Sequence, residues 1–312
     1  MNPKFVAWVE QYLFFPNWYQ RLISIALLPL TMLYCIIVAV KRLKARPINF
    51  EIPVISIGNL IVGGSGKTPV TISLAKDYED AFIVLRGYGR QTKGLQIVSL
   101  KGDIKLDVKS AGDEATLLAQ NLPNASVIVS EDRAEAIFKA KELGAKIVFL
   151  DDGFSKVNIF KYDILLRPKV EPTNVFCLPS GGYRDSKMLY SSAHLVLKDG
   201  TDFERKVWFS KNGKEISKLP RDITLLTSIS KPDRLKEFTG DINMVAYEDH
   251  HSFTKDEVDQ IKSNGILTTR KDKVKLDILD IDKDIYIMEL DINYLNNEVK
   301  TKVKSFYESY NN

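Results

Sequence analysis

The chain has 312 residues, of which 45% are apolar, and a formal net charge of +4. At roughly 100–200 residues per domain, this length predicts two domains, each with its own core. So small a net charge argues against nucleic acid as the partner. The two cysteines, Cys35 and Cys177, are too few for a disulfide framework or a metal cluster. Both are therefore expected to be small buried apolar side chains in a reducing compartment.

The N-terminal part contains an uncharged apolar run, LISIALLPLTMLYCIIVAV, from Leu22 to Val40. Its length nearly reaches the roughly 20 residues that a helix needs to cross the hydrocarbon layer, and Pro29 is expected to kink it. A basic cluster, Lys41–Arg46, follows, which predicts that the rest of the chain lies in the cytoplasm. The preceding segment, Phe5–Arg21, is rich in aromatic residues of the kind that settle at headgroup depth.

The apolar run has one structural alternative, a hydrophobic helix buried in the protein or in a dimer. Core helices usually show a polar face, which this run lacks, so membrane contact is favoured. The sequence leaves open whether the run spans the bilayer or dips into one leaflet. It is too long for the core of a cleaved signal, and no small-residue cleavage site follows. We therefore predict a membrane-associated helical segment over residues 1–46.

From Phe50 onward, short β-rich runs alternate with helical ones, which predicts a parallel sheet with ligands at the carboxyl ends of its strands. Strands are expected over Ile52–Gly58, Ala81–Leu85, Ala125–Val129 and Ala145–Leu150, and helices from about Pro69, over Gly112–Gln120 and over Glu131–Gly144. His194 lies in an apolar run and is expected to be a core or strand residue.

The texture changes after about Lys198, where the chain becomes polar and rich in turns. The stretch KNGK, residues 211–214, is a hairpin signal, and Ile223–Leu290 again carries strand and helix patterns. The fold class is therefore predicted as α/β: a parallel-sheet domain of the P-loop NTPase type over 47–200, and a smaller α/β domain over 201–312. The last helix is expected to be able to pack back on the first of these domains.

The stretch LIVGGSGKTPV, Leu60–Val70, follows an apolar strand and is typical of a phosphate-binding loop. The usual pattern is G-x-x-x-x-G-K-[ST], but Ile61 stands at the first glycine position and other glycines supply the flexibility. Lys67 is expected to reach the β- and γ-phosphates, and Thr68 to offer its hydroxyl to Mg²⁺. The backbone of the loop forms an anion nest. The predicted nucleotide-binding residues are Gly63, Gly64, Ser65, Gly66, Lys67 and Thr68.

A nucleotide loop of this kind also needs a metal-holding acid at the end of a neighbouring strand. The stretch IVFLDDGF supplies Asp151 and Asp152 directly after four apolar residues. A carboxylate can also merely cap a strand end, but two adjacent acids favour metal binding. ATP and Mg²⁺ are therefore the expected cofactors, with Thr68, Asp151 and Asp152 as the metal ligands.

Together these motifs resemble the tetraacyldisaccharide 4'-kinase family, membrane-bound enzymes that phosphorylate the lipid A precursor. The resemblance runs through most of the chain, in family order. Its motifs are SIGNLIVGGSGKTP (Ser56–Pro69), RGYGR (Arg86–Arg90), GDEA (Gly112–Ala115), DDGF (Asp151–Phe154), LPSGGYRD (Leu178–Asp185), DHHSF (Asp249–Phe253) and TTRKDKVKL (Thr268–Leu276). It implies transfer of the γ-phosphate of ATP to the 4'-hydroxyl of a tetraacyldisaccharide 1-phosphate, at the cytoplasmic face of the inner membrane. The implied partners are this glycolipid and the membrane surface.

The resemblance also implies that Asp113 pairs with a histidine of the DHH stretch to take the proton of the attacking hydroxyl. His250 is favoured, while His251 stays open as the alternative. Arg184 is expected to contact phosphate oxygens; for Arg133 an exposed helix charge is an equally good interpretation. The expected catalytic residues are thus Asp113, His250, Lys67 and Arg184.

The sequence departs from the family pattern at a few positions, and these weaken any role for the residues that stand there. The departures are Ala115 in place of proline, Ser155-Lys156 in place of Gln-His, YRDS in place of a sequence like LREP, and Arg270 in place of glutamate. The residues whose assignment they weaken are Ser155, Lys156 and Arg270. None of them falls in the phosphate loop or on the two acids.

Two other classes of function compete with the kinase. One is a membrane-anchored P-loop ATPase that acts as a switch or assembly factor, but such deviant loops carry a signature lysine near Val62, and none is present. The other is a transporter subunit, which a single apolar segment does not support.

Overall fold

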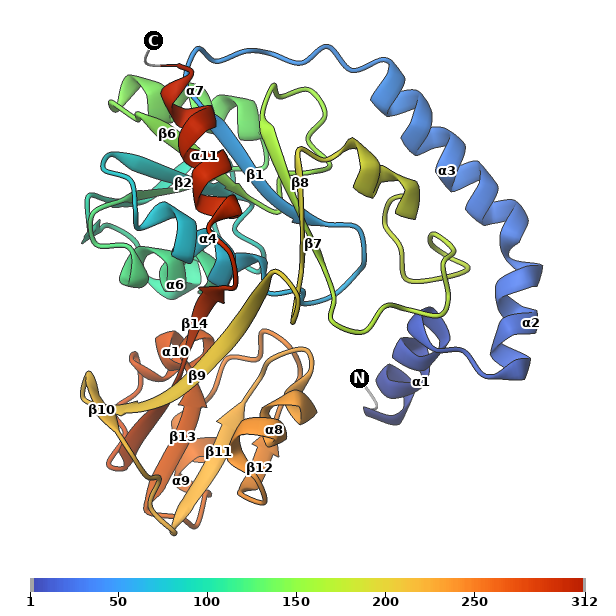
Figure 1. The fold of residues 1–312 in the computed structure, drawn as a ribbon. Helices are drawn as coiled ribbons and strands as arrows, with labels where there is room; N and C mark the ends of the chain where they lie inside the picture. The colour runs from blue at the N-terminus through green and yellow to red at the C-terminus, as the bar shows by residue number, and fades with distance from the viewer. Residues whose placement is uncertain (1–2, 311–312) are drawn as a thin grey trace. The chain divides into compact units, whose positions relative to one another are not determined.

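The computed structural model describes residues 3–310. The chain divides into two compact units, each of which contains segments that are distant in the sequence. Figure 1 shows the helices and strands, coloured along the chain. The first unit consists of the residues up to Lys67, Phe149–Glu204 and the residues from Tyr294 onward. The second consists of Thr68–Val148 and Arg205–Asn293. The predicted boundaries at 46/47 and 200/201 stay a prediction.

The first unit contains three parallel strands, in the order β1 (Val54–Asn59), β7 (Tyr162–Arg167) and β8 (Leu195–Lys198). All six residues of β1 are buried, as expected for a parallel strand covered on both faces. The final helix, α11 (Glu298–Glu308), places the ring of Phe306 against Tyr162 of β7, with 5.1 Å between the ring centroids.

Three helices precede this sheet: α1 (Pro3–Phe14), α2 (Trp18–Ala26) and α3 (Leu28–Leu43). The apolar run forms two helices rather than one kinked helix, because it breaks at Leu27 and the two halves bend by 56°. The expected effect of Pro29 explains this, since proline is tolerated in the first turn of α3 but not inside a longer helix. Among residues 3–310 no single helix is long and apolar enough to span a bilayer, whereas the bent pair α2–α3 is by length and composition.

Hydrogen bonds hold the segment 174–185 of the first unit against these helices. The hydroxyl of Thr31 donates to Ser180 Oγ at 2.7 Å and accepts from the Ser180 N–H at 3.1 Å. The hydroxyl of Tyr34 donates to the carbonyl of Arg184 at 2.5 Å. On its other side the segment joins the end of β1, because the Arg184 N–H donates to the Leu60 carbonyl at 2.7 Å. The N-terminal helices and the phosphate loop therefore share one supporting segment.

The second unit contains two groups of strands. In the first group, β2 (Ala81–Leu85) runs parallel to β5 (Ser126–Val129), and β3 (Gln96–Leu100) runs antiparallel to β5 and to β4 (Asp103–Ile104). The helices of this part are α4 (Lys67–Ala75), which begins at the last residue of the first unit, α5 (Val108–Ala111), α6 (Asp113–Asn121) and α7 (Arg133–Glu142).

The second group forms a six-stranded sheet in the order β10-β9-β14-β13-β11-β12. These strands are β9 (Phe203–Lys211), β10 (Lys214–Ile216), β11 (Ile223–Thr227), β12 (Asn243–Ala246), β13 (Gly265–Thr269) and β14 (Asp284–Tyr294). Its helices are α8 (Lys236–Thr239), α9 (Lys255–Asp259) and α10 (Arg270–Leu276). The predicted hairpin is confirmed: Asn212 and Gly213 both have positive φ, as a two-residue turn of this type requires.

The predicted α/β class with parallel strands is thus confirmed, and a few local predictions need correction. The strand β6 (Ile147–Asp151) extends one residue beyond the expected end, so Asp151 is its last residue. His194 is exposed rather than in the core; its Nδ1 accepts the N–H of Asp163 at 2.9 Å, which places it just before β8. Cys177 is buried as expected, whereas Cys35 is half-buried.

The bond between Thr31 and Ser180 leads to a stability prediction. Replacing Thr31 with valine keeps the volume but leaves the buried Ser180 N–H without an acceptor, so we expect a loss of about 1–3 kcal/mol in the free energy of unfolding. Urea unfolding measures this loss. Thr31→Ser keeps the hydroxyl and is the control; equal losses in both variants would contradict the assigned role of the hydrogen bond.

Candidate active site

The phosphate loop joins β1 to α4, which begins at Lys67. Gly63 and Gly66 have φ values of 91° and 80°, a region that favours glycine. Ile61, at the position of the usual first glycine, forms an antiparallel bridge with Tyr183 and packs into the adjoining apolar cluster. A side chain is therefore needed at this position for packing, while the turns occur later in the loop.

Three polar side chains converge on Asp152 and the end of β1. Arg184 donates two hydrogen bonds of 2.9 Å to the two carboxylate oxygens of Asp152, and it also donates to the side chain of Asn59. The Lys67 Nζ lies 3.8 Å from Asp152 Oδ1 and 3.4 Å from Asn59 Oδ1. The predicted residues Lys67, Asp152 and Arg184 are thus brought together. Two cationic side chains beside this loop are the kind of groups that bind an anion such as phosphate.

Close packing explains the sequence around the two acids. The Asp152 N–H donates to the Ile57 carbonyl at 2.9 Å, which holds the end of β6 beside β1. A Cβ on Gly153 would lie 2.5 Å from the Cβ of Leu150, so only glycine fits after the acids. Asp152 itself has a φ of 58°, a conformation that non-glycine residues rarely adopt outside turns and functional sites. Asp151 is buried at the strand end.

A second cluster lies within the second unit, around Asp113. Asp113 is the first residue of α6 and is 7% exposed. The Nδ1 of His250 lies 2.9 Å and 3.1 Å from its two carboxylate oxygens. The preceding Gly112 has a positive φ, and a Cβ there would lie 2.9 Å from the Tyr88 carbonyl, so GDE requires its glycine. The ring of Tyr88 lies 5.7 Å from that of His250.

The two members of this pair shift each other's pKa in opposite directions. Burial raises the pKa of Asp113, but the hydrogen bond with His250 and the charges of Lys271 and Lys275 outweigh it, so the pKa lies below its ordinary value. The hydrogen bond with Asp113 raises the pKa of His250, against burial and the Lys271 charge, which lower it. The pair therefore favours a carboxylate beside an imidazolium.

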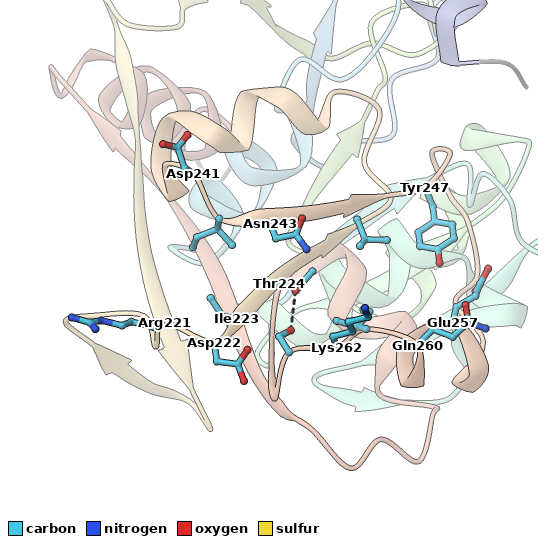
Figure 2. Close-up of a pocket in the computed structure, with 14 residues that line it drawn as sticks. Arg221, Asp222, Ile223, Thr224, Asp241, Asn243, Tyr247, Glu257, Gln260 and Lys262 are labelled. Carbon is cyan, nitrogen blue, oxygen red and sulfur yellow. Dashed lines mark hydrogen bonds between the residues drawn. The ribbon is translucent and has the colours of Figure 1, made fainter.

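The neighbouring His251 has different contacts. Its Nε2 lies 3.1 Å from both carboxylate oxygens of Glu257, and its ring stacks on Tyr247 with 4.4 Å between centroids. Tyr247 and Glu257 also line a pocket of about 660 Å³ in the second unit (Figure 2). None of the predicted site residues lines this pocket. Of the two histidines, His250 alone contacts Asp113, while its catalytic role stays a prediction.

The structure also shows where the other predicted residues lie, and it adds one residue that was not predicted. Thr68 is the second residue of α4, and Ser65 lies in the loop before it. Arg133 is buried and its Nη1 donates to the Ser130 carbonyl, so the alternative of an exposed helix charge is wrong. Asn59 was not among the predicted site residues, although a polar residue at the end of an apolar strand is a usable signal.

The fold is parallel α/β, with a glycine-rich loop before a helix. Lys67 and Arg184 both lie beside an acid at the end of a strand. Together these features define a phosphotransferase of the P-loop class. A family model described as tetraacyldisaccharide-1-P 4'-kinase matches residues 23–308. The chain therefore belongs to the tetraacyldisaccharide-1-P 4'-kinase family, as the resemblance predicted. The predicted enzyme class, a kinase, is confirmed.

Individual relatives agree with the family model. The tetraacyldisaccharide 4'-kinase of Aliarcobacter butzleri is 55% identical, over 99% of this chain and 100% of the relative. That of Helicobacter pylori is 43% identical over 91% of this chain and 90% of the relative. Among solved structures, LpxK from Aquifex aeolicus in complex with ATP is 26% identical with a TM-score of 0.74, and the match covers 91% of this chain and 99% of that one.

The Asp113–His250 pair predicts a pH dependence of stability. A raised histidine pKa stabilises fully below the ordinary value of 6.5 and ceases to do so as pH rises through the folded-state pKa. A lowered aspartate pKa stabilises fully above 3.8 and ceases to do so as pH falls through its folded-state pKa. The contribution is therefore largest between pH 3.8 and 6.5.

We expect His250→Gln to lower the free energy of unfolding more at about pH 6 than at about pH 9. Urea unfolding of both proteins at the two pH values measures this difference. Asp113→Asn removes the hydrogen bond that raises the pKa of His250. This variant should therefore also lose more free energy of unfolding at about pH 6 than at about pH 9. An equal loss at both pH values in the His250 variant would contradict the assigned charge state.

Proposed function

We propose that this chain transfers the γ-phosphate of ATP to the 4'-hydroxyl of a tetraacyldisaccharide 1-phosphate, in the biosynthesis of lipid A, at the cytoplasmic face of the inner membrane. Family membership supports the reaction class, and the observation that carries the residue assignment is the convergence of Lys67 and Arg184 on Asp152 beside the phosphate loop. The alternative of a switch ATPase does not account for a match to a kinase family over residues 23–308.

Nucleotide binding is assigned to the loop from Gly63 to Thr68. The loop N–H groups and the N-terminus of α4 would hold the phosphates, and Lys67 and Arg184 would neutralise the charge that develops during transfer. The ATP bound by LpxK from Aquifex aeolicus supports this nucleotide. In phosphoryl transfer the protein mainly positions and neutralises, so these contacts account for much of the expected rate enhancement.

The chemistry of the donor set fits Mg²⁺. Among residues 3–310, no group of three or more His, Cys, Asp or Glu side chains is arranged to hold a metal. Mg²⁺ bound with a nucleotide usually takes only one or two carboxylates, together with phosphate oxygens and waters, so Asp151, Asp152 and the Thr68 hydroxyl would suffice to hold it. When bound, the ion neutralises phosphate charge.

The proton of the attacking hydroxyl is assigned to the Asp113–His250 pair. Asp113 is held as a carboxylate by its hydrogen bond with His250 and by two nearby ammonium groups. A buried carboxylate oriented by an imidazole is a suitable proton acceptor. His250 in turn has a 27% exposed side chain, so a proton can pass from the pair to solvent.

The burial pattern of the N-terminal helices supports attachment to a membrane. Gln20, Ser24 and Thr31 are buried, whereas large apolar side chains of the same helices are exposed, the inverse of a soluble helix. The exposed residues of α2 and α3 are Trp18, Tyr19, Leu22, Ile23, Ile25, Leu30, Met32, Leu33, Ile36, Ile37, Val40 and Leu43, and Phe5 of α1 and Phe15 after it are exposed as well. The basic cluster at Lys41–Arg46 would add about 1 kcal/mol per residue near anionic lipid. A glycolipid headgroup would thereby come within reach of the enzyme.

The kinase assignment is tested with labelled ATP and vesicles that contain the tetraacyldisaccharide 1-phosphate. We expect label in the glycolipid, a loss of roughly 10²–10³-fold in rate for Lys67→Met, and a smaller loss, roughly 10-fold, for Arg184→Lys, which keeps the charge but loses the fork. Lys76→Met, at an exposed lysine just after α4, is the control. ATP hydrolysis without labelled lipid would favour the switch ATPase instead.

The membrane assignment is tested by flotation with anionic phospholipid vesicles. Ile36 and Ile37 are each 60% exposed, so the double change to serine should weaken vesicle binding by roughly 10-fold or more, while ATP affinity stays unchanged. Ile278→Ser, at an exposed apolar residue of the second unit, is the matched control. Equal vesicle binding by the double variant and the parent would contradict membrane attachment through α3.

A further inference from the structure

Helix α10 presents two lysines to the carboxylate of Asp113. Lys271 and Lys275 are four residues apart, so they share one face of the helix. Their Nζ atoms lie 3.7 Å and 3.9 Å from the same oxygen of Asp113, the Oδ2 that also lies 2.9 Å from His250. One carboxylate oxygen therefore faces an imidazole and two ammonium groups.

Lys275 is held in place by buried partners. It is 5% exposed, its Nζ lies 3.0 Å from Asp272 Oδ1 and donates to the Ser228 hydroxyl, and it lies 5.3 Å from the centre of the Phe253 ring. An ammonium group so deeply buried is stable only when paired and hydrogen-bonded, and these contacts meet that need. Its position beside Asp113 is therefore set by the packing of the second unit.

Asp272 is the anchor of this arrangement. It is fully buried and accepts hydrogen bonds from the Thr227 hydroxyl at 2.7 Å, the Thr269 hydroxyl at 2.9 Å, and both the backbone N–H and the hydroxyl of Ser228. Burial raises the pKa of Asp272, but the charge of Lys275 and these hydrogen bonds outweigh it and lower the pKa. Asp272 is therefore a fixed negative charge that holds Lys275.

Lys271 lies nearer to solvent and among further acids. Its Nζ lies 3.3 Å from Asp249 and 3.9 Å from Glu114, and its side chain is 20% exposed. Burial lowers the pKa of Lys271, but the charges of Asp113, Asp249 and Glu114 raise it by more. Lys271 is thus a second permanent cation beside the pair.

We propose that Lys271 and Lys275 are positioning residues that keep Asp113 ionised and limit how strongly His250 holds a proton. This inference rests on the proposed function of the Asp113–His250 pair. Asp113 by itself would raise the pKa of His250 further, so that less of the imidazole could take up a proton near neutral pH. Two ammonium groups within 4 Å of Asp113 Oδ2 stabilise the carboxylate and oppose the imidazolium charge, so the pair can accept a proton and release it again.

The charges that face His250 are consistent with this balance. Asp113 lies at its Nδ1, and Asp249 lies 3.7 Å from its Nε2. Lys271 approaches from α10, and the ring of Tyr88 covers one side without adding charge. Glu114 and Asp272 act through the lysines that they contact. Removing one cation would leave the acids in excess and raise the pKa of His250.

The test is an NMR titration of the three histidines in the full chain, with the His250 signal assigned from His250→Gln. We expect Lys271→Met and Lys275→Met to move the His250 midpoint to higher pH. Lys271→Arg should restore it, because the charge is kept. Lys273→Met is the matched control, since Lys273 is on the same helix but pairs with Asp277. If Lys275→Met fails to fold, Lys271→Met still decides, and an unchanged His250 midpoint there would overturn the proposal.

The kinase rate as a function of pH supplies the second measurement. Because more His250 is protonated without the lysine, Lys271→Met should lower kcat by roughly 10-fold near neutral pH, with recovery at higher pH. A moved midpoint with an unchanged rate profile would also overturn the proposal. The titration needs no turnover, so an absence of lipid phosphorylation in the parent would refute the proposed function without deciding how the lysines affect His250.

Discussion

The two hydrogen bonds between Arg184 and Asp152 are the interaction on which the nucleotide loop depends. They connect the segment 174–185 to the end of β6, and Asn59 joins the same guanidinium to the end of β1. Lys67 Nζ lies 3.8 Å from the same carboxylate oxygen to which Arg184 donates. Asp152 thus lowers the repulsion between two cations that both lie beside the phosphate loop. Replacing Arg184 or Asp152 would remove both of these hydrogen bonds.

The same segment links the N-terminal helices to the nucleotide loop. Thr31 and Tyr34 of α3 bind the backbone and side chains of this segment, and its Arg184 N–H binds the Leu60 carbonyl just before the phosphate loop. Gln20 and Ser24 of α2 and Thr31 of α3 are buried, whereas large apolar residues of the same two helices are exposed. The proposed attachment to a bilayer would use the exposed apolar side chains of these helices, while the support of the nucleotide loop uses buried polar ones.

In the second unit, lysines of α10 balance the charge of buried carboxylates. Asp113 and Asp272 are buried carboxylates, and Lys275 lies between them. A buried carboxylate is tolerated only with hydrogen bonds and opposite charge, and the lysines of α10 provide that charge to both acids. The sequence suggested no role for the TTRKDKVKL motif. In the structure its residues Lys271, Asp272 and Lys275 carry charges of this cluster, because a spacing of four places both lysines on one face of α10.

The sequence by itself determined the features that depend on local backbone geometry and on periodicity. Several features could be predicted because each depends on a short stretch of the chain. They are the glycines of the phosphate loop, the two acids at a strand end, the hairpin, and the alternation of strands and helices. The tertiary structure decided which side chains meet. The contact of Asn59 with Arg184, the choice of His250 over His251 as the neighbour of Asp113, and the approach of two lysines to that acid all join segments that are distant in the chain. Asp113 and His250, for example, are 137 residues apart, and only the packing of the folded unit brings their charges within 3 Å.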